Sequence, residues 1–335
     1  MTMIPIVLAL VAASIVVFAA AVRMRKKRKF RRSQTTLEDA LKHLYHSQER
    51  KAPVTSESLA GAVAITMDEA ATVLQRLIEQ RLVEVAEGRL QLTAAGAAEA
   101  LRIIRSHRLW ERYLADETGV DERRWHAEAE RREHQLSTQE VDALAKRLGQ
   151  PLYDPHGDPI PPVIGAMPEP RGISLQTASP GSTLMVVHVE DEPQAVYSEL
   201  VASGFHPGVR VKVVERDDKS VSVAVAGTSV RLTYPAAANV TVVFVPAKAA
   251  VAEERTLDRL PIGRRARVRS IAETCRGLQR RRLLDLGFVP GTTVAAELAN
   301  PGGDPVAYRI RGGLVALRQQ QAMHIILEDD MGKRS

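Results

Sequence analysis

The longest apolar run of the chain lies near its start, from residue 4 to residue 22, and contains no charged side chain. A helix of this length reaches about 28 Å, close to the ~30 Å hydrocarbon core of a bilayer. The run therefore predicts a membrane-spanning helix. The basic residues that follow it predict a single-pass protein of the cytoplasmic membrane, with the body of the chain in the cytoplasm. A cleaved signal peptide is the disfavoured alternative, because no basic residue precedes the run.

Helical and strand patterns alternate after this run. Leu37, Leu41 and Leu44 follow helical spacing. A short helix capped by Ser56 comes next, and another helix runs from about residue 66 to residue 80. The segments "LVEV" and "RLQL" flank Glu87-Gly88 and predict a hairpin. This order is typical of a winged helix-turn-helix, which we assign to residues 33–96.

Three further helices and a proline-rich linker follow. A long helix is predicted from about 94 to 116, a second carries the stretch "HAEAERREH" at 126–134, and "STQE" at 137–140 is a capping box for a third. These helices form a helical domain over residues 97–162, and the linker spans 163–173.

The rest of the chain contains an internal repeat. Gly204-Phe205 and Pro207-Gly208 of one copy correspond to Gly287-Phe288 and Pro290-Gly291 of the other. Short alternating strands in each copy predict two small β-barrels, at 174–247 and 255–330. The predicted fold class is therefore multidomain α+β, with a transmembrane helix, a winged helix-turn-helix, a helical domain and two small SH3-like β-barrels.

Charge and cysteine content narrow the chemistry. Residues 1–32, the predicted anchor with its basic run, hold eight of the 46 Lys and Arg residues and no acidic residue. The remainder has 46 − 8 = 38 basic against 40 acidic residues, so the net charge of +6 comes from this short segment. The single cysteine excludes an internal disulfide and a thiolate-built zinc or iron–sulfur site. We find neither a Ser/His/Asp set nor a phosphate-binding glycine loop, and we do not expect an enzyme.

The stretch at 126–134 offers several metal ligands on one helix face. At about 100° per residue, positions 126, 130, 133 and 134 fall within an arc of roughly 100°, whereas Glu128 points away. His107 and Glu111 lie one turn apart on the preceding helix. Imidazole and carboxylate ligands without thiolate suit Fe²⁺, Mn²⁺ or Zn²⁺. A salt-bridged surface involving Arg124, Arg131 and Arg132 explains the same pattern, and the pattern alone leaves both interpretations open.

The segments "HRLWERYL", "HAEAERREHQLS" and "DPHGDPIP" resemble the DtxR/MntR family of metal-dependent transcriptional repressors over residues 35–162. The resemblance implies a homodimer in which residues 97–162 provide dimerisation and metal binding. It implies one metal site at His107, Glu111 and His126, and another at Asp39, Glu130, Glu133 and His134. The oxygen-rich ligands favour Mn²⁺ or Fe²⁺. Lys42 departs from the manganese-type pattern, which has a glutamate there, and a cation at this position opposes the binding of a second ion.

Both repeat copies resemble FeoA-like, SH3-like barrels. Some family members use such a barrel to supply extra ligands to the first metal site. The acidic triplet at 190–192 is a candidate for that role, although we favour an exposed turn.

The leading hypothesis is a metal-dependent, DNA-binding regulator of metal homeostasis that recognises a double-stranded operator. Asp68 and Glu69 oppose DNA binding at the start of the recognition helix. The candidate DNA contacts on that helix are Thr66, Thr72, Gln75 and Arg76. The competing hypothesis is a membrane-anchored metal sensor that acts on a metal transporter through its FeoA-like domains.

Overall fold

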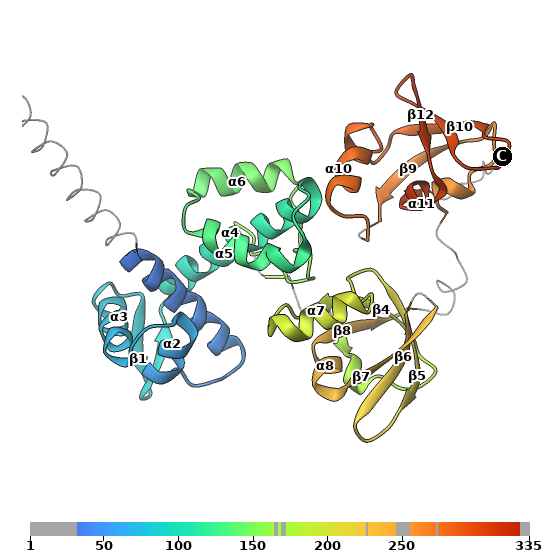
Figure 1. The fold of residues 1–335 in the computed structure, drawn as a ribbon. Coiled ribbons are helices and arrows are strands. Elements are labelled where there is room, and N and C mark those ends of the chain that lie inside the picture. The colour runs from blue at the N-terminus through green and yellow to red at the C-terminus, as the bar shows by residue number, and fades with distance from the viewer. Residues whose placement is uncertain are drawn as a thin grey trace, which may run out of the picture. The chain divides into compact units, whose positions relative to one another are not determined.

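The computed structural model describes residues 32–163, 167–168, 172–225, 227–245, 255–272 and 274–328 (Figure 1). These residues form two compact units. The first unit contains the described residues up to Ser106 together with Glu133–Gln135, and the second contains His107–Arg132 and the described residues from Leu136 onward.

The first unit has the helix and hairpin order of a winged helix. It contains a helix over 32–49, α2 (Ser56–Val63), α3 (Met67–Glu79), β1 (Val83–Ala86), β2 (Arg89–Leu92) and the first half of α4 (Ala94–Glu117). Leu41, Leu44, Leu59 and Leu77 are fully or almost fully buried and form its core. The hairpin closes through Glu87 and Gly88, whose φ angles of 52° and 73° give the left-handed turn that suits a two-residue loop.

The second unit begins with helices. The second half of α4 is followed by a 3₁₀ turn (Glu122–Arg124), α5 (Trp125–Glu133) and α6 (Thr138–Arg147). Ser137 caps α6 through the predicted capping box with Glu140. Leu109, Leu136 and Val141 form one buried cluster, and Trp125 packs with Leu114 in another.

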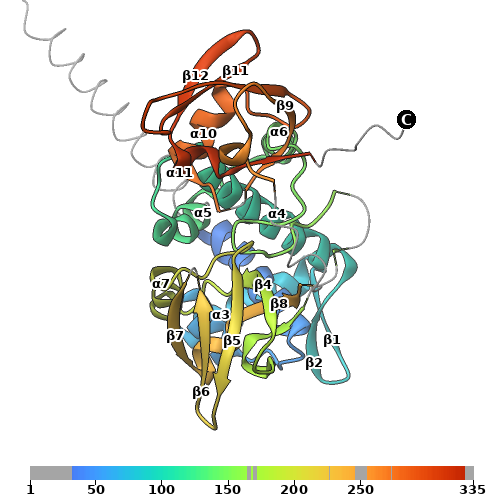
Figure 2. The same ribbon diagram turned by 90° about the vertical axis from the view of Figure 1, so that its right-hand side faces the viewer.

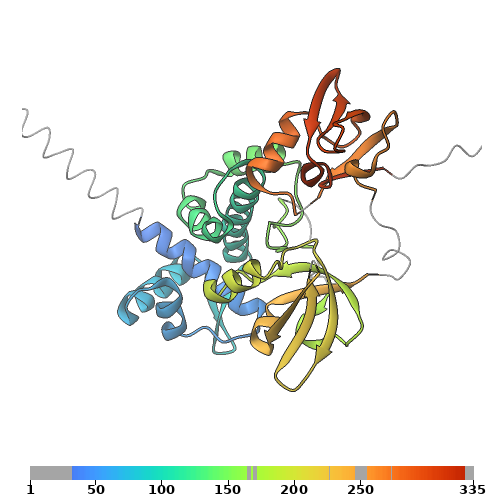
Figure 3. The ribbon, with the colours of Figure 1, turned by 45° about the vertical axis from the view of Figure 1, so that its right-hand side comes forward.

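Two β-domains follow the helices, and Figures 2 and 3 show their strands from two sides. The first β-domain (residues 173–245) has the strand order β3-β8-β4-β5-β6-β7. Its elements are β3 (Ile173–Ser174), a 3₁₀ turn (Leu175–Thr177), β4 (Thr183–Val189), α7 (Gln194–Ala202), β5 (Arg210–Arg216), β6 (Ser220–Val225), β7 (Thr228–Thr233), α8 (Tyr234–Ala238) and β8 (Val240–Phe244).

The second β-domain (residues 255–328) repeats this topology. Its strand order, β12-β11-β10-β9-β13, matches the first domain from β7 through to β8, except that β3 has no counterpart in it. Its elements are a 3₁₀ turn (Leu257–Arg259), β9 (Arg265–Ile271), α10 (Gly277–Asp285), β10 (Thr293–Ala299), β11 (Val306–Ile310), β12 (Gly313–Leu317), α11 (Gln319–Ala322) and β13 (Ile325–Leu327). The internal repeat is therefore a repeat of structure as well as of sequence.

The expected fold class is corrected in one respect, the membrane anchor. Across the part of the chain that the structure describes, every helix is too short or too polar to traverse a bilayer. The span predicted at residues 4–22 lies outside the described residues. The prediction of a fold built on a transmembrane helix is thus wrong, and the single-pass membrane localisation and the membrane as a partner are withdrawn with it.

Candidate metal centre

Donor groups gather around Glu111 in the second unit. His107 and Glu111 lie one turn apart on α4, and His107 Nε2 is 3.2 Å from Glu111 Oε1. His126, at the start of α5, places its Nδ1 3.6 Å from the same oxygen. The rings of His107 and His126 have their centroids 4.9 Å apart. The three residues predicted to form the first site are thus brought together, and all three are buried or partly buried.

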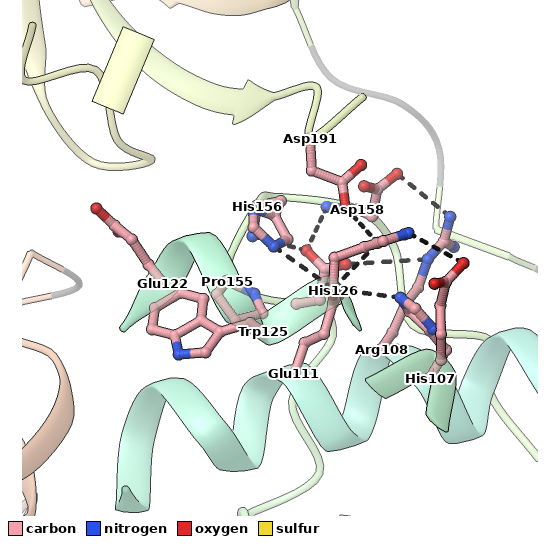
Figure 4. A network of polar contacts seen from close by, with 12 residues as sticks. His107, Arg108, Glu111, Glu122, Trp125, His126, Pro155, His156, Asp158 and Asp191 are labelled. Atoms are coloured by element: carbon pink, nitrogen blue, oxygen red, sulfur yellow. Dashed lines mark hydrogen bonds and ion pairs between the residues drawn. The ribbon is translucent and has the colours of Figure 1, made fainter. Parts of the chain in front are cut away.

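Two further residues join this cluster, which we call the Glu111 group (His107, Glu111, His126, His156 and Asp191). The sequence analysis did not single out His156, whereas Asp191 belongs to the acidic triplet that it named as a candidate source of extra ligands. Figure 4 shows Glu111, His126, His156 and Asp191 converging. His156 Nε2 is 3.6 Å from Glu111 Oε1, and Asp191 Oδ2 is 2.8 Å from His126 Nδ1. Asp191 is mostly covered, so the expectation that it lies in an exposed turn is wrong, whereas its neighbour Glu192 is 67% exposed.

Loop geometry brings these two residues to Glu111. Asp154 accepts backbone hydrogen bonds from His156, Gly157 and Asp158, and this folds the "DPHGDPIP" segment into a tight loop. The carbonyl oxygen of His156 accepts a bond from Val189 N at the end of β4. Asp191 follows two residues later. The loop therefore positions His156, and the end of β4 positions Asp191.

His156 is the most unusual member of the Glu111 group. It is 2% exposed, and neither ring nitrogen has a hydrogen-bond partner among the described residues. A buried polar side chain without a partner is costly. An imidazole in this condition, aimed at a buried carboxylate, is suited to bind a cation.

The carboxylates of the Glu111 group stabilise positive charge on the residues around them. Burial alone would raise the pKa of Glu111, but the charges of His107 and His156 hold it well below its usual value. Burial alone would lower the pKa of His126, but hydrogen bonds with Asp191, Glu111 and Glu130 raise it to about 12. Burial alone would also lower the pKa of His156, but the negative charge of Glu111 raises it to about 9. Protons on imidazole here supply the charge that a divalent ion would otherwise supply.

A second cluster, the Glu133 group (Asp39, Glu133 and His134), lies in the first unit. His134 Nε2 is 3.0 Å from Asp39 Oδ1 and 3.3 Å from Glu133 Oε1. Glu133 is 1% exposed. Burial alone would lower the pKa of His134, but Asp39, Glu38 and Glu133 raise it to about 9.

Two charged residues modify the Glu133 group. Lys42 donates to both carboxylate oxygens of Glu133, at 2.8 and 3.0 Å. Glu38, which the sequence reasoning missed, is 6% exposed, and its Oε2 lies 2.6 Å from His134 Nδ1. The position of Glu38 beside Asp39 on the same helix was the available signal. Its carboxylate holds the ring so that Nε2 is the nitrogen that faces Asp39 and Glu133.

Glu130, predicted with Asp39, Glu133 and His134, has a different neighbour. Its Oε1 lies 3.4 Å from His126 Nε2, and its side chain is 54% exposed. Its assignment to the second site remains a prediction.

The predicted DNA contacts lie on the exposed face of α3. Thr66 is the N-cap of the helix and forms a capping box with Glu69. Glu69 therefore serves the helix end, which accounts for an acidic residue at this position. Thr72, Gln75 and Arg76 are exposed, and Arg76 donates to Ser33 at 2.9 Å.

Comparison with known proteins identifies families that match the helical domain and the two β-domains. Residues 93–162 match the family model described as iron dependent repressor, metal binding and dimerisation domain. Residues 173–243 and 255–329 each match the FeoA domain, so this domain is present in tandem.

Individual relatives agree with these matches. The iron-dependent repressor IdeR of Mycobacterium tuberculosis (strain H37Rv) is 33% identical over 168 residues, 46% of this chain and 73% of the relative. IdeR of Mycobacterium leprae is 30% identical over 206 residues, 57% of this chain and 89% of the relative. A solved manganese-dependent transcriptional repressor in complex with manganese is similar with a TM-score of 0.57 and 32% identity, covering 62% of this chain and all of that one.

Proposed function

Because the chain belongs to the iron-dependent repressor family, we propose that it is a transcriptional repressor whose DNA binding depends on Fe²⁺ or Mn²⁺. The observation that carries this proposal is the pair of buried imidazole and carboxylate clusters, the Glu111 group and the Glu133 group. They contain six of the seven ligands that the resemblance to metal-dependent repressors implies, all but Glu130, and the side chains converge within each unit.

The residues present fit a divalent ion of intermediate hardness. Both groups combine imidazole nitrogen with carboxylate oxygen and contain no thiolate, which suits Fe²⁺ or Mn²⁺. The ring of His156, which makes no hydrogen bond to the described residues, and the buried carboxylate of Glu111 are the features that such an ion would satisfy. An ion bound at either group would supply the positive charge that imidazolium groups otherwise provide.

The Glu133 group links metal binding to the winged helix. Asp39 belongs to the helix over 32–49, whose Leu41 and Leu44 form part of the core around α2 and α3. Glu133 and His134 lie at the end of α5, and the Ser106 hydroxyl donates to the Glu133 carbonyl. Asp39, Glu133 and His134 held in one geometry fix the winged helix relative to this chain segment. In the metal-free protein, Lys42 and the protonated ring of His134 offset the charges of Glu133 and Asp39, and a bound ion would supply part of that charge instead.

DNA recognition falls to α3. Its exposed Thr72, Gln75 and Arg76 provide hydrogen-bond donors and acceptors for base edges and phosphates. The match of residues 93–162 to a metal-binding and dimerisation domain supports a homodimer. Two copies of α3 would then read two half-sites of a double-stranded operator.

The experiment is metal-dependent selection of DNA. The purified chain, with Mn²⁺ or Fe²⁺ under anaerobic conditions, is used to retain fragments of genomic DNA, and the retained fragments are tested by gel retardation with and without EDTA. We expect retardation of specific fragments that needs metal. His126→Ala should weaken metal-dependent retardation at least about tenfold, because it removes a ligand of the Glu111 group. Glu199→Gln, which changes an exposed carboxylate of α7, is the matched control. Selective retardation that is indifferent to metal, or none at all, would refute the proposed function.

A further inference from the structure

Arginines at the start of α10 hold the second β-domain against the helices of its unit. Arg280 Nε lies 3.1 Å from Asp116 Oδ1 near the end of α4. Arg281 Nη1 lies 2.9 Å from Glu117 Oε2, the last residue of α4. These ion pairs bring the start of α10 to the turn between α4 and α5, and both of those helices carry members of the Glu111 group.

Arg276, the N-cap residue of α10, is held in place by two residues of this turn and of α5. Its side chain is 16% exposed, and its Nη1 lies 3.4 Å from Glu122 Oε2. Its guanidinium group lies over the ring of Trp125, 5.4 Å from the ring centroid. An arginine fixed by a carboxylate on one side and by an aromatic face on another has little freedom to reorient.

The other terminal nitrogen of this guanidinium group binds the loop that carries His156. Arg276 Nη2 donates to the carbonyl oxygen of Pro155 at 2.9 Å. The next carbonyl oxygen along the chain, that of His156, accepts from Val189 N of the first β-domain, also at 2.9 Å. The two β-domains therefore hold two consecutive peptide groups of one loop.

Trp125 connects this contact to the imidazole of His156. The centroids of the two rings are 6.0 Å apart, and Figure 4 shows Trp125, Pro155 and His156 beside one another. The imidazole makes no hydrogen bond to the described residues. Its aim at Glu111 therefore depends on the backbone of the loop and on ring packing, and Arg276 contacts both Pro155 and Trp125.

The internal repeat places the same segment of both β-domains beside the Glu111 group, with different chemistry. In the first copy, the segment before α7 contains Asp191, a member of the group, and the N-cap residue of α7 is Pro193. In the second copy, the N-cap residue of α10 is Arg276. One copy therefore places a carboxylate in the group, whereas the other places a guanidinium group on the loop behind it.

We propose that Arg276 is a positioning residue for metal binding, through which the second β-domain holds His156 in place at the Glu111 group. This inference rests on the proposed function, because it requires that the Glu111 group binds a divalent cation. Loss of a residue that orients a metal ligand typically lowers metal affinity by about 10- to 100-fold. The second FeoA domain would thus support the metal centre without supplying a ligand to it.

Arg276→Met tests this role in the full chain, because methionine fills space but donates no hydrogen bond. The probe is Co²⁺, whose affinity is measured by calorimetry and whose visible absorption reports its ligand set. Asp39→Asn is present in every sample, including the reference protein, to weaken the Glu133 group. We expect Arg276→Met to lower Co²⁺ affinity about tenfold and to shift the absorption bands as His156→Ala shifts them.

A double-variant comparison separates positioning from a general loss of stability. If Arg276 acts through His156, adding Arg276→Met to His156→Ala should change Co²⁺ affinity by no more than about twofold, because residues that act through one another are not additive. A second variant, Arg276→Met with Glu122→Gln, leaves no buried carboxylate without its cation and should show the same tenfold loss. Thermal unfolding verifies that each variant is folded.

The matched control is Arg281→Met, which removes an arginine that pairs with Glu117 rather than with the loop. It should keep the Co²⁺ affinity and the absorption bands of the reference protein. The inference is overturned if Arg276→Met keeps that affinity, if Arg281→Met loses as much, or if the loss is equally large with and without His156.

Failure of the two proposals can be told apart. If Arg276→Met loses Co²⁺ affinity as expected but no duplex shows metal-dependent selective binding, the proposed repressor function fails and this inference stands. If selective metal-dependent binding is found but Arg276→Met keeps the affinity and bands of the reference protein, the inference fails and the proposed function stands. A wild-type chain that takes up neither Co²⁺ nor Mn²⁺ would overturn both.

Discussion

At the scale of single residues, Lys42 sets the charge of the Glu133 group. Its ammonium group donates to both oxygens of Glu133, which is almost fully buried. In Lys42→Gln this carboxylate loses its cation, and we expect the metal-free protein to lose about 1 to 3 kcal/mol of unfolding free energy. Mn²⁺ should then stabilise the variant more than it stabilises the wild type. Thermal unfolding with and without Mn²⁺ measures both effects, with Lys51→Gln, an exposed lysine near the end of the same helix, as the control. Equal stabilisation of the variant and the wild type by Mn²⁺ would contradict this role.

Proton release is a second consequence of these clusters. The pKa values of His126, His134 and His156 are raised to about 12, 9 and 9 by neighbouring carboxylates that outweigh burial. At pH 7 these imidazoles are protonated, and each must lose its proton before it can bind a metal ion. Apparent metal affinity should therefore increase as pH rises from 6 to 8. Calorimetry in two buffers of different ionisation enthalpy should show release of about one or more protons per ion. A heat signal that does not depend on the buffer would rule this out.

Local sequence could identify some members of the Glu111 group and not others. His107 and Glu111 are one helical turn apart, and His126 belongs to a stretch that resembles a known metal-binding segment, so all three could be named in advance. His156 and Asp191 lie far along the chain from Glu111, and their approach depends on how the 154–158 loop meets the end of β4. Such contacts arise from tertiary packing and cannot be predicted from local sequence. The ion pair between Lys42 and Glu133 could not be predicted either, although the sequence analysis noted that Lys42 replaces the glutamate of the manganese-type pattern.

At the scale of elements, close backbone contact fixes the 154–158 loop on β4. Gly157 has a φ of 101°, and a Cβ there would lie 2.0 Å from the Val187 carbonyl oxygen. Gly157→Ala should therefore push the loop away from β4 and separate His156 from Asp191. We expect metal affinity of the Glu111 group to fall by about 10- to 100-fold, the range seen when ligand positioning is lost.

The control for this prediction separates contact from backbone strain. Gly149 also has a positive φ, 77°, but a Cβ at that position would meet nothing within 4 Å. Gly149→Ala should cost stability through its backbone alone and leave metal affinity unchanged. Calorimetric titration of both variants decides the matter, and equal loss of metal affinity in the two would mean that loop contact has no part in binding.

Element order was more predictable than element contact. The helix expected from residue 66 to residue 80 is observed as Met67–Glu79, and the Glu87-Gly88 turn joins β1 to β2. Periodicity and turn chemistry are local properties, which is why they could be read from the chain. The capping role of Glu69 could not be assigned from the sequence, because its hydrogen bonds with Thr66 form only in the folded helix. That the acidic start of α3 opposes DNA binding stays a prediction.

At the scale of the whole molecule, metal binding and DNA binding are linked by thermodynamics. If metal increases the affinity for a specific duplex by some factor, that duplex must increase the affinity for metal by the same factor. Coupling of this kind is typically 1–3 kcal/mol, or about 5- to 150-fold. We expect Mn²⁺ titrations of the wild type, with and without the selected duplex, to differ by the factor that gel retardation gives.

The two ligand groups allow this coupling to be assigned. Asp39 lies on the helix that builds the winged-helix core, whereas the Glu111 group lies entirely in the second unit. Asp39→Asn should therefore abolish most of the mutual enhancement while the Glu111 group still takes up metal. His156→Ala should lower metal uptake by the Glu111 group. It should leave the mutual enhancement of metal and DNA binding that depends on the ion at the Glu133 group. If Asp39→Asn kept the full reciprocal factor, the winged helix would have to respond to metal through residues other than the Glu133 group.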